Sequence, residues 1–207
     1  MELLLIRHAL PQRREVEDGP ADPELSDVGH VQADHLARYL ADEHLDAIYS
    51  SPLRRARQTA APVARDRGIE VVIEDDVAEY DRDSSSYVPV EELRASDDPR
   101  WQQMLAGEWD DPEQRDGFDA RVLESIERIV SAHRGQRVAI ACHGGVINTY
   151  LSHVIGLGDG RRSFFYPNYT SIHRVAASSA GARSVITLNE TSHLRGTGLP
   201  MGMFQQG

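Results

Sequence analysis

The chain has 207 residues, of which 40% are hydrophobic and 27% are charged, and this balance is typical of one globular domain. Its formal net charge of −11 argues against a broad nucleic-acid-binding surface. All 22 basic residues are arginines, which excludes Schiff-base chemistry and a phosphate-binding loop built on lysine.

Short apolar runs alternate with helical patterns along the chain. The apolar runs have the form of strands covered on both faces, and the longer stretches repeat apolar residues at helical spacing. Ser26 is suited to cap the first helix, while Pro52 suits the first turn of the second and Gly68 its end. In chain order, we expect a strand at 3–6, a helix at 28–40, a strand at 46–49, a helix at 52–64, a strand at 71–73, a helix at 118–130, a strand at 138–142, a helix at 146–155, and closing strands at 171–176 and 184–188.

This alternation predicts a three-layer α/β/α sandwich with a mostly parallel central sheet. The pattern breaks between residues 80 and 117, where the chain is polar and carries three prolines and both tryptophans. A connection of this length inside a compact domain is usually functional or disordered. We therefore expect a single domain over residues 1–207 with an inserted cap at about 80–117; the alternative is a solvated surface excursion.

Residues capable of chemistry follow four of the predicted strands. In an open α/β sheet, ligand sites form beyond the carboxyl ends of the strands, and helix N-termini there attract anions. A parallel sheet can therefore bring two histidines, several arginines and a carboxylate together. These residues are Arg7 and His8 after the first strand, Arg54, Arg55 and Arg57 after the second, Glu79 after the third, and His143, Gly144 and Gly145 after the fourth.

Those residue types suit phosphoryl transfer from an ester. The guanidinium fork of arginine neutralises phosphoryl oxygens through bidentate hydrogen bonds. A neutral imidazole is a competent nucleophile, and nearby positive charge keeps it unprotonated. A carboxylic acid with a raised pKa can protonate the leaving group and then deprotonate the incoming water.

Four motifs occur in order: LIRHA at 5–9, LSDVG at 25–29, SSPLRRARQTA at 50–60 and ACHGG at 141–145. Together they resemble the histidine phosphatase superfamily, the group that includes the cofactor-dependent phosphoglycerate mutases. The resemblance extends from residue 3 to about residue 155, with the middle segment unaligned.

The resemblance implies a role for each matching residue. His8 looks like the phosphorylated nucleophile, and Arg7 like its neighbouring phosphate ligand. Arg55 matches the second phosphate arginine of the family. His143 matches the second histidine, a catalytic residue that contacts the phosphoryl oxygens, and Gly144 is expected beside it in the phosphate-binding set.

The general acid is expected from the segment after the third strand. Glu79 resembles the family's general acid, and Asp76 and Asp81 are the alternatives. Arg54 and Arg57 are expected to be surface or structural residues rather than ligands.

The chain also departs from the family pattern. Ala9 stands where glycine is frequent, Pro11 where threonine or serine is common, and Arg14 where the mutases carry asparagine. The glycine- and tryptophan-rich stretch of mutase-like members is absent after Glu79. These changes leave the phosphoryl-transfer residues in place and argue against mutase specificity. Arg14 raises the hypothesis of a substrate with a second anionic group.

The sequence thus predicts a cytoplasmic phosphatase that hydrolyses phosphomonoesters through a phosphohistidine on His8. The alternatives are a cofactor-dependent phosphoglycerate mutase-like phosphotransferase and a catalytically silent phosphate-binding module. No zinc-type ligand spacing appears, so neither metal nor cofactor is expected. The expected partner is a small-molecule phosphomonoester, without nucleic acid or membrane; a homodimer is common in the family. Cys142 is the only cysteine, which rules out an intrachain disulfide and fits a reducing compartment.

Overall fold

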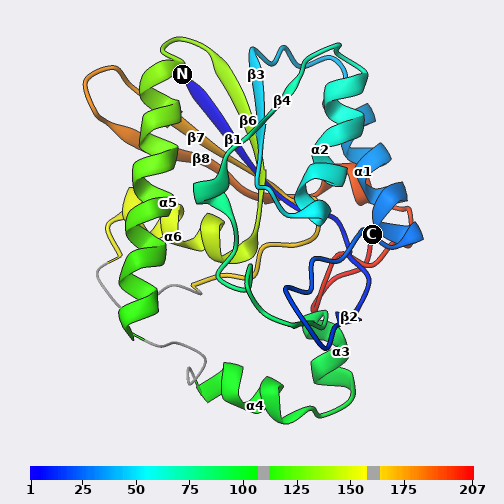
Figure 1. Cartoon of the computed structure of the whole chain (residues 1–207). Coiled ribbons are helices and arrows are strands. Elements are labelled where there is room, and N and C mark those ends of the chain that lie inside the picture. The colour runs from blue at the N-terminus through cyan, green and yellow to red at the C-terminus, as the bar shows by residue number, and fades with distance from the viewer. Residues whose placement is uncertain (107–111, 158–163) are drawn as a thin grey trace.

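A six-stranded mixed sheet forms the centre of the molecule, with strand order β4-β3-β6-β1-β7-β8 (Figure 1). The computed structural model describes residues 1–106, 112–157 and 164–207. Neighbouring strands among the first four are parallel, whereas β7 is antiparallel to β1 and β8 to β7. The strands are β1 (Glu2–Arg7), β3 (Ala47–Ser50), β4 (Val71–Ile73), β6 (Arg137–Cys142), β7 (Ile172–Ala177) and β8 (Arg183–Glu190).

Helices cover both faces of this sheet. Figure 1 shows α1 (Asp27–Tyr39) and α2 (Arg54–Arg65) on one side, and α5 (Pro112–Ala132) and α6 (Gly144–Ile155) on the other. Side chains of β1 alternate between the two cores: Leu3 and Leu5 belong to the core of α5 and α6, and Leu4 and Ile6 to that of α1 and α2. The predicted α/β sandwich is confirmed, and the continuous apolar run at 3–6 is explained by burial on both faces.

The helix starts follow local hydrogen bonding. Ser26 caps α1 as expected, since its hydroxyl accepts the N–H of Gly29 at 3.0 Å. The expectation for Pro52 was wrong, because α2 begins at Arg54 and Pro52 lies in the preceding turn. The physical reason is a distant cap: the carboxylate of Asp22 accepts the N–H of Arg54 at 3.0 Å.

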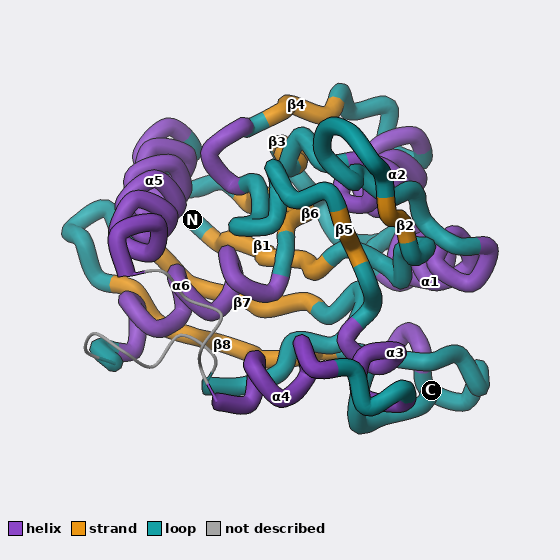
Figure 2. Tube along the Cα trace, turned by 60° about the horizontal axis from the view of Figure 1, so that its bottom comes forward, coloured by secondary structure: helices purple, strands orange, loops and turns teal. Residues whose placement is uncertain are grey.

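The segment after β4 leaves the sandwich and lies at the end of the sheet where β1 finishes (Figure 1). The β5 strand in this segment pairs antiparallel with β2, and Figure 2 shows this ribbon and α3 at that end. Trp109, within the predicted cap, lies outside the described residues. The segment after β4 contains the 3₁₀ helix η1 (Asp75–Val77), β5 (Ser86–Tyr87), α3 (Val90–Ala95) and α4 (Pro99–Ala106). The partner of β5, β2 (Arg14–Glu15), precedes α1 in the chain, and a second 3₁₀ helix, η2 (Ser192–Leu194), follows β8.

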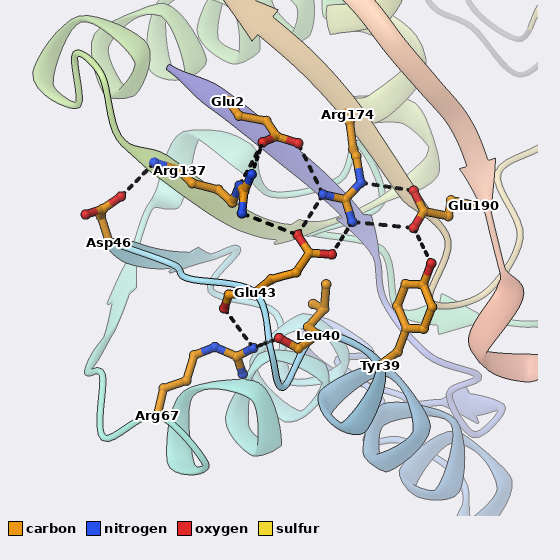
Figure 3. Close-up of polar contacts among 9 residues, drawn as sticks. All are labelled: Glu2, Tyr39, Leu40, Glu43, Asp46, Arg67, Arg137, Arg174 and Glu190. Atoms are coloured by element: carbon orange, nitrogen blue, oxygen red, sulfur yellow. Dashed lines mark hydrogen bonds and ion pairs between the residues drawn. The ribbon is translucent and has the colours of Figure 1, made fainter.

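An ion-pair network surrounds Glu2 at the start of β1, the end of the strand opposite to Arg7 (Figure 3). Arg174 on β7 donates hydrogen bonds to Glu43 at 2.6 Å, Glu190 at 3.0 Å and Glu2 at 3.1 Å. It thereby joins β1, β7, β8 and the loop after α1. In the ranges that the structure describes, no helix has both the length and the apolar character needed to cross a bilayer.

Candidate active site

Two histidines lie side by side where β1 and β6 end. The parallel pairing sets Arg7 opposite Cys142, so the next residues, His8 and His143, emerge together. The N–H of His8 donates to the carbonyl of Cys142 at 2.9 Å, and the two imidazole centroids are 5.2 Å apart. Both side chains are buried. The pairing of the two strands therefore fixes the spacing of the two rings.

His8 is held as a neutral imidazole with one nitrogen open. Its Nδ1 lies 2.8 Å from the carbonyl oxygen of Ala9. Because a carbonyl only accepts, we assign the ring proton to Nδ1, which leaves the lone pair on Nε2. Burial, together with the charges of Arg55 and Arg7, holds the pKa of His8 well below its ordinary value of 6.5. His8 is therefore a candidate nucleophile at neutral pH.

His143 is oriented by Ser51, a residue of the SSPLRRARQTA motif. Its Nε2 lies 2.7 Å from the hydroxyl of Ser51, which also accepts the N–H of Leu53 at 3.3 Å. The hydroxyl hydrogen of Ser51 can then be donated to Nε2, and on that basis we assign the His143 ring proton to Nδ1. That Nδ1 is buried and has no hydrogen-bond partner. His143 thus presents a free N–H donor to the site.

Arg7 makes cation–π contacts with two tyrosine rings. Its guanidinium carbon lies 4.3 Å from the ring centroid of Tyr169 and 5.0 Å from that of Tyr166. It also donates to the carbonyl of Pro167 at 2.5 Å. Cation–π contact and a backbone acceptor hold the charge in one orientation.

Arg55 is almost completely buried at the start of α2. It donates to the carboxylate of Asp81 at 2.7 Å, and its guanidinium carbon lies 4.7 Å from the ring centroid of Tyr87. The Nε atoms of Arg55 and Arg7 are both buried without a partner, as is Nδ1 of His143. Unpaired buried donors are rare, and three of them around one histidine suit a bound oxyanion.

Glu79 is a buried carboxyl with a raised pKa. Burial, and then the negative charge of Asp81, raise the pKa of Glu79 from 4.5 to about 7. Its carboxylate accepts the N–H of Gly145 at 2.7 Å and that of Tyr80 at 3.1 Å, which partly opposes the rise. A Cβ at position 145 would overlap the Glu79 carboxylate. The carboxylate can therefore come close to the backbone of residue 145 only because the second glycine of the ACHGG motif has no side chain. A group with this pKa can donate a proton and later accept one.

The alternatives to Glu79 are placed differently. Asp76 is 46% exposed and lies 3.5 Å from Arg128 at the surface, whereas Asp81 is the partner of Arg55.

Gly144 begins α6 directly after His143, where the backbone N–H groups of a helix start face outward. Arg54 forms an ion pair with Glu24 instead.

The structure therefore brings Arg7, His8, Arg55, Glu79, His143 and Gly144 to one end of the sheet. Arg57 is exposed. In the part of the chain that the structure describes, histidine, cysteine and acidic side chains form no group able to hold a metal ion. The sequence patterns assigned no role to Ser51, Tyr87, Tyr166 or Tyr169. Ser51 stands inside the SSPLRRARQTA motif, whereas nothing local distinguishes the tyrosines.

The fold and the grouping of these side chains define an α/β enzyme of the phosphoryl-transfer class. Comparison with known families agrees: residues 3–191 match the family model of the histidine phosphatase superfamily (branch 1). The chain belongs to the histidine phosphatase superfamily.

Its relatives support a phosphatase, a hydrolase, as the activity class. The chain is 32% identical to phosphoserine phosphatase 1 of Hydrogenobacter thermophilus over 203 residues, which cover 94% of each protein. Three mycobacterial relatives at 29% identity are longer, and the match covers 54% of their length.

Solved structures share the fold. A phosphoserine phosphatase from Entamoeba histolytica superposes with a TM-score of 0.71 at 23% identity, covering 93% of this chain and 98% of that one. A mycobacterial glucosyl-3-phosphoglycerate phosphatase gives a TM-score of 0.71 at 21% identity, covering 91% and 98%.

Proposed function

We propose that this phosphatase hydrolyses small phosphomonoesters without a metal, through a phosphohistidine on His8. The observation that carries the proposal is the open Nε2 of a buried, neutral His8 beside three unpartnered donors. Those donors are Nε of Arg7, Nε of Arg55 and Nδ1 of His143. Together they can neutralise phosphoryl oxygens next to a nucleophile.

In the first step, the phosphoryl oxygens accept hydrogen bonds from these donors and from the N–H of Gly144 at the start of α6. Nε2 of His8 attacks phosphorus, and the bond from phosphorus to the ester oxygen breaks. The protonated carboxyl of Glu79 gives its proton to the leaving oxygen. The alcohol departs, and Glu79 is left as a carboxylate.

In the second step, the Glu79 carboxylate takes a proton from a water molecule as the water oxygen attacks phosphorus. The bond between phosphorus and Nε2 breaks, and inorganic phosphate leaves. Glu79 is protonated again and His8 is neutral, so the cycle closes without an added reactant. A pKa of about 7 suits both halves of this exchange.

The relatives suggest candidate substrates. Phosphoserine and glucosyl-3-phosphoglycerate are named for similar proteins and are small phosphomonoesters with further charged or polar groups. A cytoplasmic location and a homodimer remain predictions from the sequence.

The test is release of inorganic phosphate from a panel of phosphomonoesters in the presence of a chelator. Wild type is compared with His8→Ala and with His30→Ala, which removes an exposed histidine from α1. We expect turnover and an acid-labile phosphoenzyme in wild type and His30→Ala, and neither in His8→Ala. Equal release by His8→Ala, or loss of turnover in chelator, would contradict the proposal. Release only with a phosphorylated primer would indicate a mutase, and binding without turnover a silent module.

A further inference from the structure

The hydroxyl of Thr59 connects the segment after His8 to the helix that carries Arg55. Thr59 lies on α2 and is completely buried. Its hydroxyl donates to the carbonyl of Arg55 at 2.7 Å and accepts the N–H of Ala9 at 2.9 Å. Because a carbonyl only accepts and a backbone N–H only donates, both roles of the hydroxyl are fixed. Thr59 therefore holds the N–H of Ala9 at a set position relative to α2.

Gln32 on α1 holds the peptide whose carbonyl faces His8. Its side chain is completely buried, and its Oε1 accepts the N–H of Leu10 at 2.8 Å. That N–H belongs to the same planar peptide as the carbonyl of Ala9, so fixing one fixes the direction of the other. The carbonyl of Ala9 is the group that lies 2.8 Å from Nδ1 of His8. Gln32 therefore directs the acceptor of the His8 ring proton.

The motif at residues 25–29 secures the next carbonyl. The carbonyl of Leu10 accepts the N–H and the hydroxyl of Ser26, each at 3.0 Å. A Cβ on Gly29 would overlap this oxygen, so the glycine makes room for it. Each backbone N–H and carbonyl of Ala9 and Leu10 thus has a specified partner. The chain directly after the nucleophile is held from both α1 and α2.

The position of the Ala9 carbonyl matters because it selects the tautomer of His8. A neutral imidazole carries one ring proton, and the hydrogen bond of one nitrogen decides the state of the other. With the proton on Nδ1, the lone pair of Nε2 is free to attack phosphorus. With the proton on Nε2, the ring has no lone pair on the side of the substrate.

We propose that Thr59 and Gln32 are positioning residues for the nucleophile, which hold Ala9 so that its carbonyl keeps the ring proton of His8 on Nδ1. This inference rests on the proposed function, since it assumes that Nε2 of His8 attacks the phosphoryl group. Neither side chain contacts the phosphate in this scheme, and each acts through the backbone of residues 9 and 10.

The test compares four variants with wild type. Thr59→Val keeps a similar shape without the hydroxyl, and Gln32→Met keeps a similar length without the amide. Thr59→Ser restores the hydroxyl and should rescue the wild-type behaviour. Thr149→Val is the matched control, because Thr149 is a buried threonine of α6 whose hydroxyl donates to Asp119 at 2.9 Å, away from Ala9.

The first readout is the tautomer of His8, taken from the nitrogen chemical shifts of its ring. We expect Nδ1–H in wild type, Thr59→Ser and Thr149→Val, and a mixture of tautomers in Thr59→Val and Gln32→Met. In these last two, kcat for p-nitrophenyl phosphate should fall about tenfold to a hundredfold. Inhibition by inorganic phosphate should change by less than about twofold, because the phosphate ligands remain in place.

Several outcomes would overturn the proposal. An unchanged His8 signal in either folded variant would do so, and so would a mixed signal with the kcat of wild type. A loss of phosphate inhibition as large as the loss of kcat would show that Arg55 has moved instead. Should Thr59→Val fail to fold, Gln32→Met decides alone, since it acts from another helix.

Failure of the proposed function would be recognised separately. Turnover by His8→Ala equal to that of wild type would contradict the phosphohistidine chemistry. The chemical shifts of the His8 ring require no turnover, so they still report whether Thr59 and Gln32 set its tautomer.

Discussion

The hydroxyl of Ser51 lies 2.7 Å from Nε2 of His143, and both groups are fully buried. Ser51 belongs to the turn before α2, while His143 follows β6, so the contact joins the arginine-bearing segment to the second histidine. When the Ser51 hydroxyl donates in this contact, the imidazole proton lies on Nδ1 and His143 offers a donor to a bound phosphate. Ser51 is therefore a positioning residue that acts through His143.

Ser51→Ala should remove this control of the tautomer. We expect kcat/KM to fall about tenfold to a hundredfold, the loss typical of weakening one donor to a transition-state oxyanion. The tautomer of His143, read from nitrogen chemical shifts, should change from Nδ1–H to a mixture. Ser50→Ala is the matched control, because Ser50 is equally buried but donates to the carbonyl of Ser51. An unshifted His143 signal in Ser51→Ala would disprove the assignment.

Glu79 should shape the dependence of activity on pH. Its pKa is raised to about 7, so the carboxyl can donate a proton below pH 7 and is ionised above it. We expect kcat/KM to fall by up to tenfold per pH unit above pH 7. On the acid side, kcat/KM should begin to fall only well below pH 6.5, where His8 becomes protonated. Glu79→Gln should abolish the alkaline limb, whereas the exposed Asp76→Asn should leave the profile as it is.

The same raised pKa carries a stability cost. The folded-state pKa of Glu79 lies above its unfolded value of 4.5, so its favourable contribution is complete below pH 4.5 and is lost as pH rises through 7. At pH 8 the fold holds a buried carboxylate. Glu79→Gln should therefore raise the free energy of unfolding at pH 8 by about 3 kcal/mol relative to its effect at pH 4. Denaturant melts at the two pH values test this; a difference of zero would contradict burial of the charge.

Arg14 should act on substrates with a second negative group. It stands directly opposite Tyr87 in the ribbon of β2 and β5, and cross-strand partners point to the same face. Since Tyr87 stacks on Arg55, Arg14 emerges on the side of the site. We expect Arg14→Ala to raise KM about tenfold for phosphomonoesters that carry a carboxylate, with no such change for p-nitrophenyl phosphate. Arg13→Ala, on the adjacent residue, is the control; equal effects on both esters would remove the specificity role.

Arg174 should matter for stability rather than catalysis. It is 12% exposed and serves Glu2, Glu43 and Glu190 together (Figure 3). Arg174→Ala leaves three carboxylates close to one another. We expect the free energy of unfolding to fall by about 1–3 kcal/mol, and by less in high salt. Arg65→Ala, which removes an exposed pair with Asp66, should leave the melting temperature unchanged. A loss that does not depend on salt would point to packing alone.

The fold was largely predictable because its signals are local. The run at residues 3–6 is apolar throughout since both faces of β1 are covered, and Ser26 caps α1 through its own third neighbour. The start of α2 was misplaced because its cap, Asp22, comes from 32 residues earlier. Such a partner leaves no trace in a local pattern.

The candidate site also combines residues that local sequence signals indicate with residues that only long-range packing brings into place. Arg7, His8 and His143 follow strand ends, where position along the chain already indicates position in space. Tyr87 and Tyr169 reach the arginines from the segment after β4 and from the turn before β7. Their role depends on long-range packing.

The placing of β1 between β6 and β7 has a consequence for how the protein is made. Glu2 and Arg137, which start the paired strands β1 and β6, are 135 residues apart. Strand β1 therefore has no neighbouring strand in the sheet until β6, which begins 135 residues later, has been synthesised. High contact order of this kind slows folding and leaves an apolar strand uncovered during translation. Nascent chains that end before β6 should accordingly depend on chaperones to remain free of aggregation.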